Sequence, residues 1–116
     1  MKARDSVLRL RRFAADEAAR KVADLEQMIR EFQNIALDLE RQIASEEDRT
    51  GVRDRNHFAY STFAKAAAQR RENLQTSITD LEMKFEAARR EAEDAKAAAE
   101  QLAPVERSET GAGRRR

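Results

Sequence analysis

The chain has 116 residues, which is enough for one domain at most, and 39% of those residues are charged. With five Phe, one Tyr and no Trp, it lacks the large apolar side chains that fill a compact globular core, so solvated helices are favoured instead. A net charge of +1 disfavours a general nucleic-acid binder, and the absence of cysteine excludes disulfides and thiolate metal sites.

The sequence also lacks the usual signs of membrane insertion or secretion. No apolar run approaches the roughly 18 residues that a membrane span requires. The first residues do not contain the continuous apolar centre of a secretory signal. We therefore expect a cytoplasmic protein.

The chain begins with a basic segment, residues 1–12, in which five basic residues meet a single acid, Asp5. The basic residues are Lys2, Arg4, Arg9, Arg11 and Arg12. The apolar residues interleaved with them, up to the following position, are Val7, Leu8, Leu10 and Phe13. Three interpretations stay open: a solvated helix end, a docking surface for an acidic partner, and a membrane-surface helix or transit peptide. Asp5, Asp16 and Glu17 weaken the third.

A first long helix is predicted over about residues 4–49, because this stretch has no Gly or Pro and is rich in Ala, Leu, Glu, Arg and Gln. Its apolar residues recur at alternate steps of three and four, as in the seam of a coiled coil. The seam consists of Val22, Leu25, Ile29, Phe32, Ala36, Leu39 and Ile43. Upstream, the residues Val7, Leu10, Ala14 and Ala18 extend it only if one extra step of four, a stutter, is inserted.

A turn is predicted over about residues 50–60, where the composition changes. Gly51 suits the left-handed position that follows a helix. Asp54 and Asn56 favour turns. Ser61 or Thr62 is the expected N-cap of the next helix, because a hydroxyl can accept a hydrogen bond from an open amide of the first turn.

A second long helix is predicted over about residues 61–103. Its seam consists of Tyr60, Ala64, Ala67, Arg71, Leu74, Ile78, Leu81, Phe85, Ala88, Ala92, Ala95, Ala99 and Leu102. Arg71 is the polar exception, and we expect its stem to lie over Leu39 with the guanidinium turned outward toward Asp38 or Glu40. Pro104 is expected to end this helix, and residues 105–116 are predicted to form a disordered basic tail.

The two seams predict an all-α fold, an antiparallel two-helix coiled-coil hairpin over residues 1–104. In the register that the turn sets, Phe32 faces Ile78 and Leu25 faces Phe85. The large residues then gather in the middle of the hairpin and toward the turn, whereas the other end is lined by alanines. Since burial of an alanine contributes only a fraction of what a leucine contributes, we expect that end to be the less stable one.

The sequence holds no recognisable catalytic or cofactor site. His57 is the only histidine, so no histidine pair can hold a metal ion. No Gly-rich phosphate loop and no Gly-x-Ser-x-Gly elbow occurs. Two helices also do not form the water-excluding pocket that catalysis needs. We therefore expect a protein that is not an enzyme and has neither a cofactor nor a metal.

The aromatic residues near the turn form one group, and its role has two interpretations. The group consists of His57, Phe58, Tyr60 and Phe63, and is followed by Gln69 and Arg70. The aromatic rings can close the end of the coiled coil over Ile43 and Ala44. Alternatively, some of them stay exposed and anchor a partner, because aromatic and Arg residues dominate binding hot spots.

Two stretches resemble the flagellar FliJ family, in the form found in alphaproteobacteria. The first is the opening, residues 1–13 (MKARDSVLRLRRF). The second is the segment after Gly51, in which residues 57–60 (HFAY) lead into residues 63–71 (FAKAAAQRR). Together they cover about a third of the chain, and the second is the more specific because a heptad repeat does not dictate His-Phe-Ala-Tyr.

The resemblance implies a fold and a role. Members of this family form an antiparallel two-helix coiled coil that resembles the central stalk of rotary ATPases. They act in the cytoplasmic part of the flagellar type III export machine, peripheral to the inner membrane. There the coiled-coil end engages the ring of the export ATPase, and another surface contacts the export gate and helps to cycle export chaperones. The implied function is a non-enzymatic coupling factor and general chaperone of protein export, in flagellum biogenesis, motility and chemotaxis.

The resemblance also assigns candidate contact residues. Those for the export ATPase are Arg4, Arg9, Arg11 and Arg12. Those for the export gate or the chaperones are His57, Phe58, Tyr60, Phe63, Gln69 and Arg70. The basic start and the arginine-rich tail meet at the end of the hairpin opposite the turn, and their positive field would guide this end into an acidic ring lumen. We expect a monomer with no nucleic-acid partner.

Three alternatives remain. The heptads can serve only assembly, in a structural homodimer of two chains. A nucleic-acid-binding coiled coil would use the basic start, although the nearby acids dilute its field, and its affinity would fall steeply with salt. A membrane-surface helix would show binding to liposomes.

Overall fold

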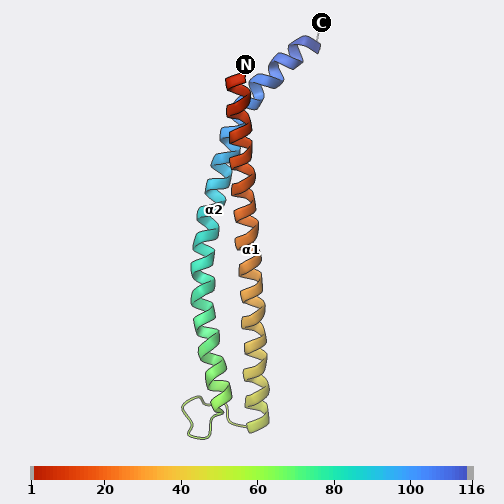
Figure 1. Ribbon diagram of the computed structural model, residues 1–116. Coiled ribbons are helices and arrows are strands. Elements are labelled where there is room, and N and C mark those ends of the chain that lie inside the picture. Colours follow the sequence, from red (N-terminus) through yellow and green to blue (C-terminus); the bar gives the residue numbers. More distant parts are fainter. Residues whose placement is uncertain (1, 115–116) are drawn as a thin grey trace. The chain divides into compact units, whose positions relative to one another are not determined.

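The computed structural model describes the backbone of residues 2–114 and the side chains up to Leu102 (Figure 1). Two α-helices, α1 (Lys2–Thr50) and α2 (Thr62–Arg114), make up the described chain together with the loop 51–61 that joins them. No strand occurs in this part of the chain. The all-α helical hairpin predicted from the two seams is therefore confirmed.

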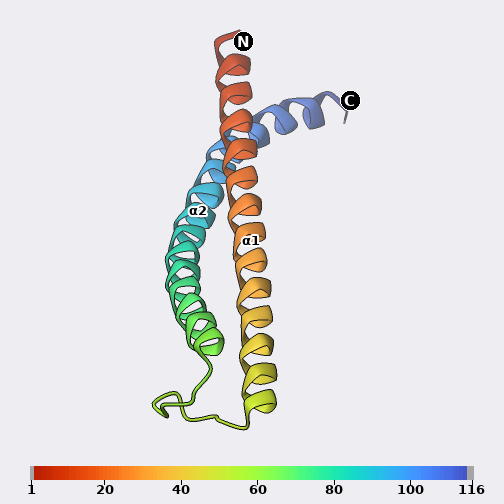
Figure 2. The ribbon, with the colours of Figure 1, turned by 60° about the horizontal axis from the view of Figure 1, so that its bottom comes forward.

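The helices form two compact units, each of which contains a piece of α1 and a piece of α2. The loop unit consists of Glu26–Met83, so it includes the loop and the adjoining halves of both helices. The terminal unit consists of Met1–Leu25 and Lys84–Arg116. Within the loop unit, the two helices run antiparallel on either side of the loop (Figures 1 and 2).

Helix α1 ends as its sequence predicts. Gly51 has φ +74°, in the left-handed region that glycine adopts without a steric penalty. Its N–H donates to the carbonyl of Glu47 over 2.8 Å, which is the hydrogen bond of a helix end closed by a left-handed residue. The Thr50 hydroxyl oxygen accepts the next amide, that of Val52, at 3.3 Å. The end of α1 therefore carries its own caps.

Helix α2 is capped at its start by Ser61, one of the two residues predicted for this role. The Ser61 hydroxyl oxygen accepts the N–H of Ala64 at 3.2 Å, and its carbonyl accepts the N–H of Lys65 at 3.0 Å. One open amide of the first turn is thereby satisfied by the cap, and the helix begins at Thr62.

The far end of α2 differs from the prediction. The sequence placed the end of this helix at Ala103 and a disordered tail after Pro104, whereas α2 continues to Arg114. A proline inside a helix removes one amide donor and disturbs the turn before it, but the rest of the ladder can continue. Residues 115 and 116, and the side chains from 103 onward, lie outside the described residues, and the role of the basic tail stays a prediction.

The core of the loop unit is the predicted seam, and it contains large side chains. Its buried seam residues are Leu39, Tyr60, Ala64, Ala67, Ile78 and Leu81, and Ala68, which was not predicted to lie in the seam, is buried as well. Ile29, Phe32 and Leu74 are half-buried beside them. The guanidinium of Arg71 turns outward to Glu40, with 3.4 Å between the charged atoms, as predicted for this polar seam position. This pair also fits the predicted register.

The core of the terminal unit consists mainly of alanines. Leu8, Ala88 and Ala99 are buried there, and Val22, Ala92 and Ala95 are half-buried. The larger seam residues Leu25 and Phe85 also belong to this unit and are half-buried. The contacts between its helix segments include an ion pair, in which Lys21 lies 3.7 Å from Glu91, and a hydrogen bond, which Arg11 donates to the carbonyl of Ala98 over 2.9 Å.

The predicted start of the α1 seam is wrong. The inward positions are Arg4, Leu8, Arg11, Ala15 and Ala18, which continue the spacing of three and four without a stutter. Val7, Leu10 and Ala14, which were predicted to lie in the seam, are exposed. The continuous heptad therefore decides which residues face α2, even where this places Arg4 and Arg11 in the seam and leaves the more apolar Val7 and Leu10 exposed.

Candidate functional site

The loop 51–61 is an ordered structure that holds one aromatic pair at its apex. The His57 N–H donates to the Asp54 carbonyl, and the Tyr60 N–H to the His57 carbonyl, each over 3.0 Å, so two turns follow one another. The Asp54 carboxylate accepts the Asn56 N–H at 2.9 Å, as in an Asx turn. His57 Nδ1 accepts the Ala59 N–H at 3.0 Å. These local hydrogen bonds define where the side chains between them point.

Phe58 is the most exposed large apolar side chain among the described residues, with 96% of its surface open to solvent. Its only ring partner in this part of the chain is His57, whose ring centroid lies 4.7 Å away at an interplanar angle of 23°. Neither ring closes the end of the coiled coil over Ile43. For these two residues the structure favours the interpretation in which aromatic rings stay exposed.

Tyr60 has the opposite role, because it is buried with 8% of its surface exposed. Its hydroxyl donates to the carboxylate of Glu47 over 2.8 Å. This hydrogen bond, together with burial, raises the pKa of the Tyr60 hydroxyl above its ordinary value. Tyr60 therefore fastens the loop to the last turns of α1 and is withdrawn from any partner.

Glu46 provides the second attachment of the loop to α1. Its carboxylate accepts hydrogen bonds from Arg49 and from the Ser61 hydroxyl, the latter at 2.9 Å. The bonds from Arg49 and Ser61 lower the pKa of the Glu46 carboxyl. Glu46 and Glu47 were not predicted as functional residues, because the predicted register places Arg49 and Thr50 opposite Ser61 and Tyr60, and the two glutamates lie about one helical turn before them.

The remaining tip candidates lie at the start of α2 and are exposed. Phe63 has 57% of its surface open to solvent, and Gln69 and Arg70 are exposed as well. Phe63 and Arg70 are seven residues apart and so lie on one side of the helix. Gln69 donates to Asn73 over 3.1 Å. Of the six predicted tip residues, five are exposed and Tyr60 is buried.

The four arginines of the basic start do not share one environment. Arg9 and Arg12 are exposed, whereas Arg4 and Arg11 are half-buried at seam positions. The guanidinium of Arg11 is committed to the carbonyl of Ala98 in α2. Arg9 and Arg12 are therefore the clearer candidates for contact with an outside partner, and replacing Arg11 would also disturb the pairing of the helix segments.

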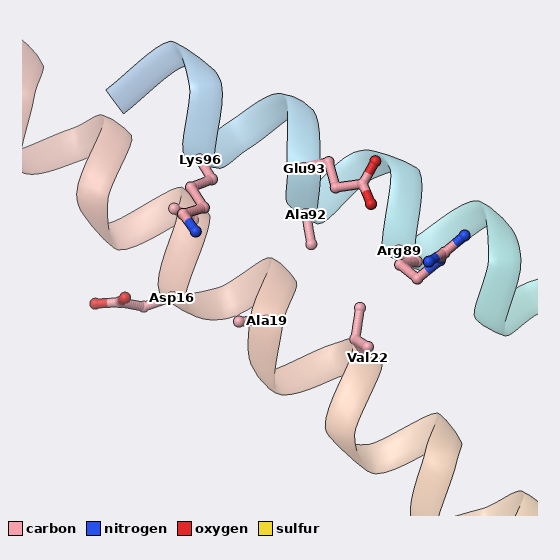
Figure 3. A pocket seen from close by; sticks show the side chains of 8 residues that line it. Asp16, Ala19, Val22, Arg89, Ala92, Glu93 and Lys96 are labelled. Carbon is pink, nitrogen blue, oxygen red and sulfur yellow. The ribbon is translucent and has the colours of Figure 1, made fainter. Parts of the chain in front are cut away.

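The terminal unit also contains a groove of about 410 Å³ that the sequence analysis did not predict. Its lining residues are Ala15, Asp16, Ala19, Val22, Arg89, Ala92, Glu93 and Lys96. Figure 3 shows Val22 and Ala92 pointing toward one another across the open space, with Asp16 pointing away from it. The groove exists because alanines leave the space between two helices unfilled.

Within the residues that the structure describes, neither helix contains a stretch that is long and apolar enough to cross a membrane. Among the described side chains, no group of three or more His, Cys, Asp or Glu is placed so that it could hold a metal ion.

Comparisons with protein-family models, with curated proteins and with solved structures give no match.

Proposed function

We propose that this chain is a non-enzymatic coupling factor of flagellar type III protein export, with the role that its resemblance to the FliJ family implies. The observation that carries the proposal is the loop between α1 and α2. It is fastened to α1 by Tyr60 and Ser61, yet it leaves Phe58 almost wholly exposed. An aromatic side chain held on an ordered support is a suitable anchor for a partner, because little conformational entropy is lost when it binds.

In this proposal, the tip binds the export gate or the export chaperones. The tip surface consists of His57, Phe58, Phe63, Gln69 and Arg70. It combines two exposed phenylalanines with a guanidinium, which are residue types that bind strongly when they are desolvated at an interface. Tyr60, which the sequence placed in the same group, supports this surface from beneath.

The basic start is proposed to contact the export ATPase, with Arg9 and Arg12 as its exposed arginines. Long-range attraction between opposite charges would steer the two proteins together. The proposed location is the cytoplasm, at the inner-membrane base of the flagellum.

The tip assignment is tested with the full chain and the purified cytoplasmic domain of the export gate. The double variant Phe58→Ala/Phe63→Ala should reduce binding at least tenfold, because both anchors are removed. Met83→Ala is the matched control, since Met83 is a similarly exposed apolar residue of the same unit. Undiminished binding of gate and chaperones by the double variant would refute the assignment.

The ATPase assignment is tested by charge reversal. Arg9→Glu/Arg12→Glu should weaken capture of the export ATPase at physiological salt, whereas Arg90→Glu in the same unit should not. Equal capture by the two variants would rule out the basic start as the ATPase contact. Failure to capture any export component from cells with the unaltered chain would reject the flagellar role as a whole.

A second candidate function is a structural coiled coil that associates with another copy of itself. The groove in the terminal unit favours it, because helices that present alanines can approach one another closely. Light scattering over a range of concentrations separates the two candidates. A monomer at micromolar concentration contradicts structural assembly, and a stable dimer that is lost in Ala19→Glu supports it.

A further inference from the structure

The first turns of α1 carry an exposed apolar patch beside the seam. Leu10 and Phe13 have 68% and 64% of their surfaces exposed, and Val7 is exposed beside them. Ala3 and Ala14 are exposed at neighbouring positions along the same side. These five residues form the outer patch. It exists because Leu8 and Arg11, and not Val7 and Leu10, occupy the seam.

The outer patch has a definite length. A single exposed apolar residue is ordinary on a protein surface, but neighbouring Val, Leu and Phe side chains mark a surface that binds something. From Ala3 to Ala14 the patch extends over about 16 Å of helix. It stops at Glu17, which forms an ion pair with Arg20 at 3.0 Å. The outer patch is therefore a stripe about three helical turns long, interrupted by Ser6, and the turn that follows is charged.

Basic residues run along both edges of the outer patch. On a helical projection, Lys2 and Arg9 flank it on one side, and Arg4 and Arg11 lie on the seam side. Residues 2–13 contain a single acid, Asp5. Arg11 is fixed by its bond to the Ala98 carbonyl, so one positive charge has a defined position beside the patch. The surface thus offers an apolar stripe between two positive borders.

We propose that the outer patch binds an amphipathic helix of another protein whose apolar stripe is bordered by Asp and Glu. Such a helix would bury Leu10 and Phe13 in its apolar stripe, and its acids would meet the basic edges on both sides. A second copy of this chain is disfavoured because its own outer patch has the same positive borders. A lipid surface is disfavoured because Asp16 and Glu17 follow the patch directly, where anionic headgroups would repel them. The inference does not depend on the flagellar role.

The test uses the full chain and a synthetic probe peptide of about 14 residues. The peptide carries a Leu stripe spaced by three and four, with Glu along both edges, and a fluorescent label. Fluorescence anisotropy should show saturable binding. Leu10→Gln/Phe13→Gln should weaken the binding at least tenfold, and Arg9→Glu should weaken it several-fold. Met83→Gln, which alters an equally exposed apolar residue elsewhere, should leave it unchanged.

Three controls decide between the occupants. A second peptide with Lys in place of every Glu should bind at least tenfold more weakly, and equal binding of the two peptides would overturn the charge argument. Binding to phosphatidylglycerol vesicles that is lost in Leu10→Gln/Phe13→Gln, with no binding of the acidic peptide, would overturn the proposal in favour of a lipid surface. Self-association that the same double variant abolishes would overturn it in favour of a second copy.

Discussion

The loop unit and the terminal unit use the same heptad spacing but fill it with side chains of different size. In the loop unit the buried residues include Leu39, Ile78 and Leu81, whereas in the terminal unit Leu8 is the one buried residue larger than alanine among the described side chains. Because the free energy of burial scales with apolar area, the loop unit should contribute most of the stability. Periodicity alone therefore predicts that helices pair but does not predict how strongly.

The difference in side-chain size also explains where the surface features lie. Large seam residues in the loop unit give a firm base for the hydrogen-bonded loop and its exposed Phe58. Small seam residues in the terminal unit leave the groove beside Ala92 open. We infer that the loop unit presents a fixed surface, and that the terminal unit can adapt to what binds it.

The largest expected effect comes from truncating the seam of the loop unit. Ile78→Ala should lower the free energy of unfolding by about 2 kcal/mol or more, because it leaves a cavity beside Leu81 and removes buried methyl groups. Ala88→Gly, the paired change in the terminal unit, should cost about 1 kcal/mol through helix propensity. Urea titration measures both, and an Ala88→Gly cost that equals the cost of Ile78→Ala would contradict the comparison.

A smaller effect of opposite sign is expected when the groove is filled. Ala92→Leu should raise the free energy of unfolding by up to about 1 kcal/mol, because the added side chain buries apolar surface in the groove. Ala97→Leu, at an exposed position of the same helix, is the control and should change little. Thermal unfolding, followed by circular dichroism, measures the stability of both variants. Destabilisation by Ala92→Leu alone would mean that the groove has no room.

The attachment of the loop by Tyr60 should appear in the alkaline range. Since the pKa of Tyr60 is raised in the folded chain, its contribution is complete below its ordinary pKa of 10.0 and is lost as the pH rises through the folded value. Tyr60→Phe should lower the urea midpoint at neutral pH and flatten its fall above pH 10. An alkaline limb that is unchanged in Tyr60→Phe would show that other groups cause it.

Glu46 should give the corresponding, smaller effect in the acid range. Its pKa is lowered below the ordinary 4.5, so its contribution is complete above that pH and is lost as the pH falls through the folded value. Glu46→Gln should reduce the acid dependence of the loop unit, because the bond from Ser61 then goes to a neutral group. Hydrogen exchange of the Ala64 amide below pH 4.5 measures this acid dependence. Identical acid dependence in the two proteins would remove Glu46 from the account.

Much of the hairpin could be predicted from the sequence. The apolar spacing indicates paired helices, the glycine indicates where the first helix ends, and a hydroxyl residue indicates where the second begins. The seam from Val22 onward and the left-handed Gly51 follow from these signals, and the N-cap was narrowed to Ser61 or Thr62, of which Ser61 is the cap. The start of α1 could not be predicted in this way. Val7 and Leu10 are more apolar than Arg4 and Arg11, so a local comparison selects the wrong residues, and only the packing of a continuous heptad decides between them.

The location of the candidate site could be predicted, but not which of its aromatic side chains are buried and which are exposed. Phe58, Phe63 and Tyr60 are all aromatic, and sequence alone does not tell which ring closes the hairpin and which stays exposed. The outcome depends on Glu47, which accepts the Tyr60 hydroxyl, and no comparable acceptor serves a phenylalanine.

Hydrogen exchange of the full chain is the most direct test of the claim that the large seam residues of the loop unit hold the hairpin together. It compares residues 74–81 with residues 92–99 of α2 in one protein and under one set of conditions. The account predicts slower exchange and a higher opening free energy for residues 74–81. Equal protection, or stronger protection at residues 92–99, would contradict it.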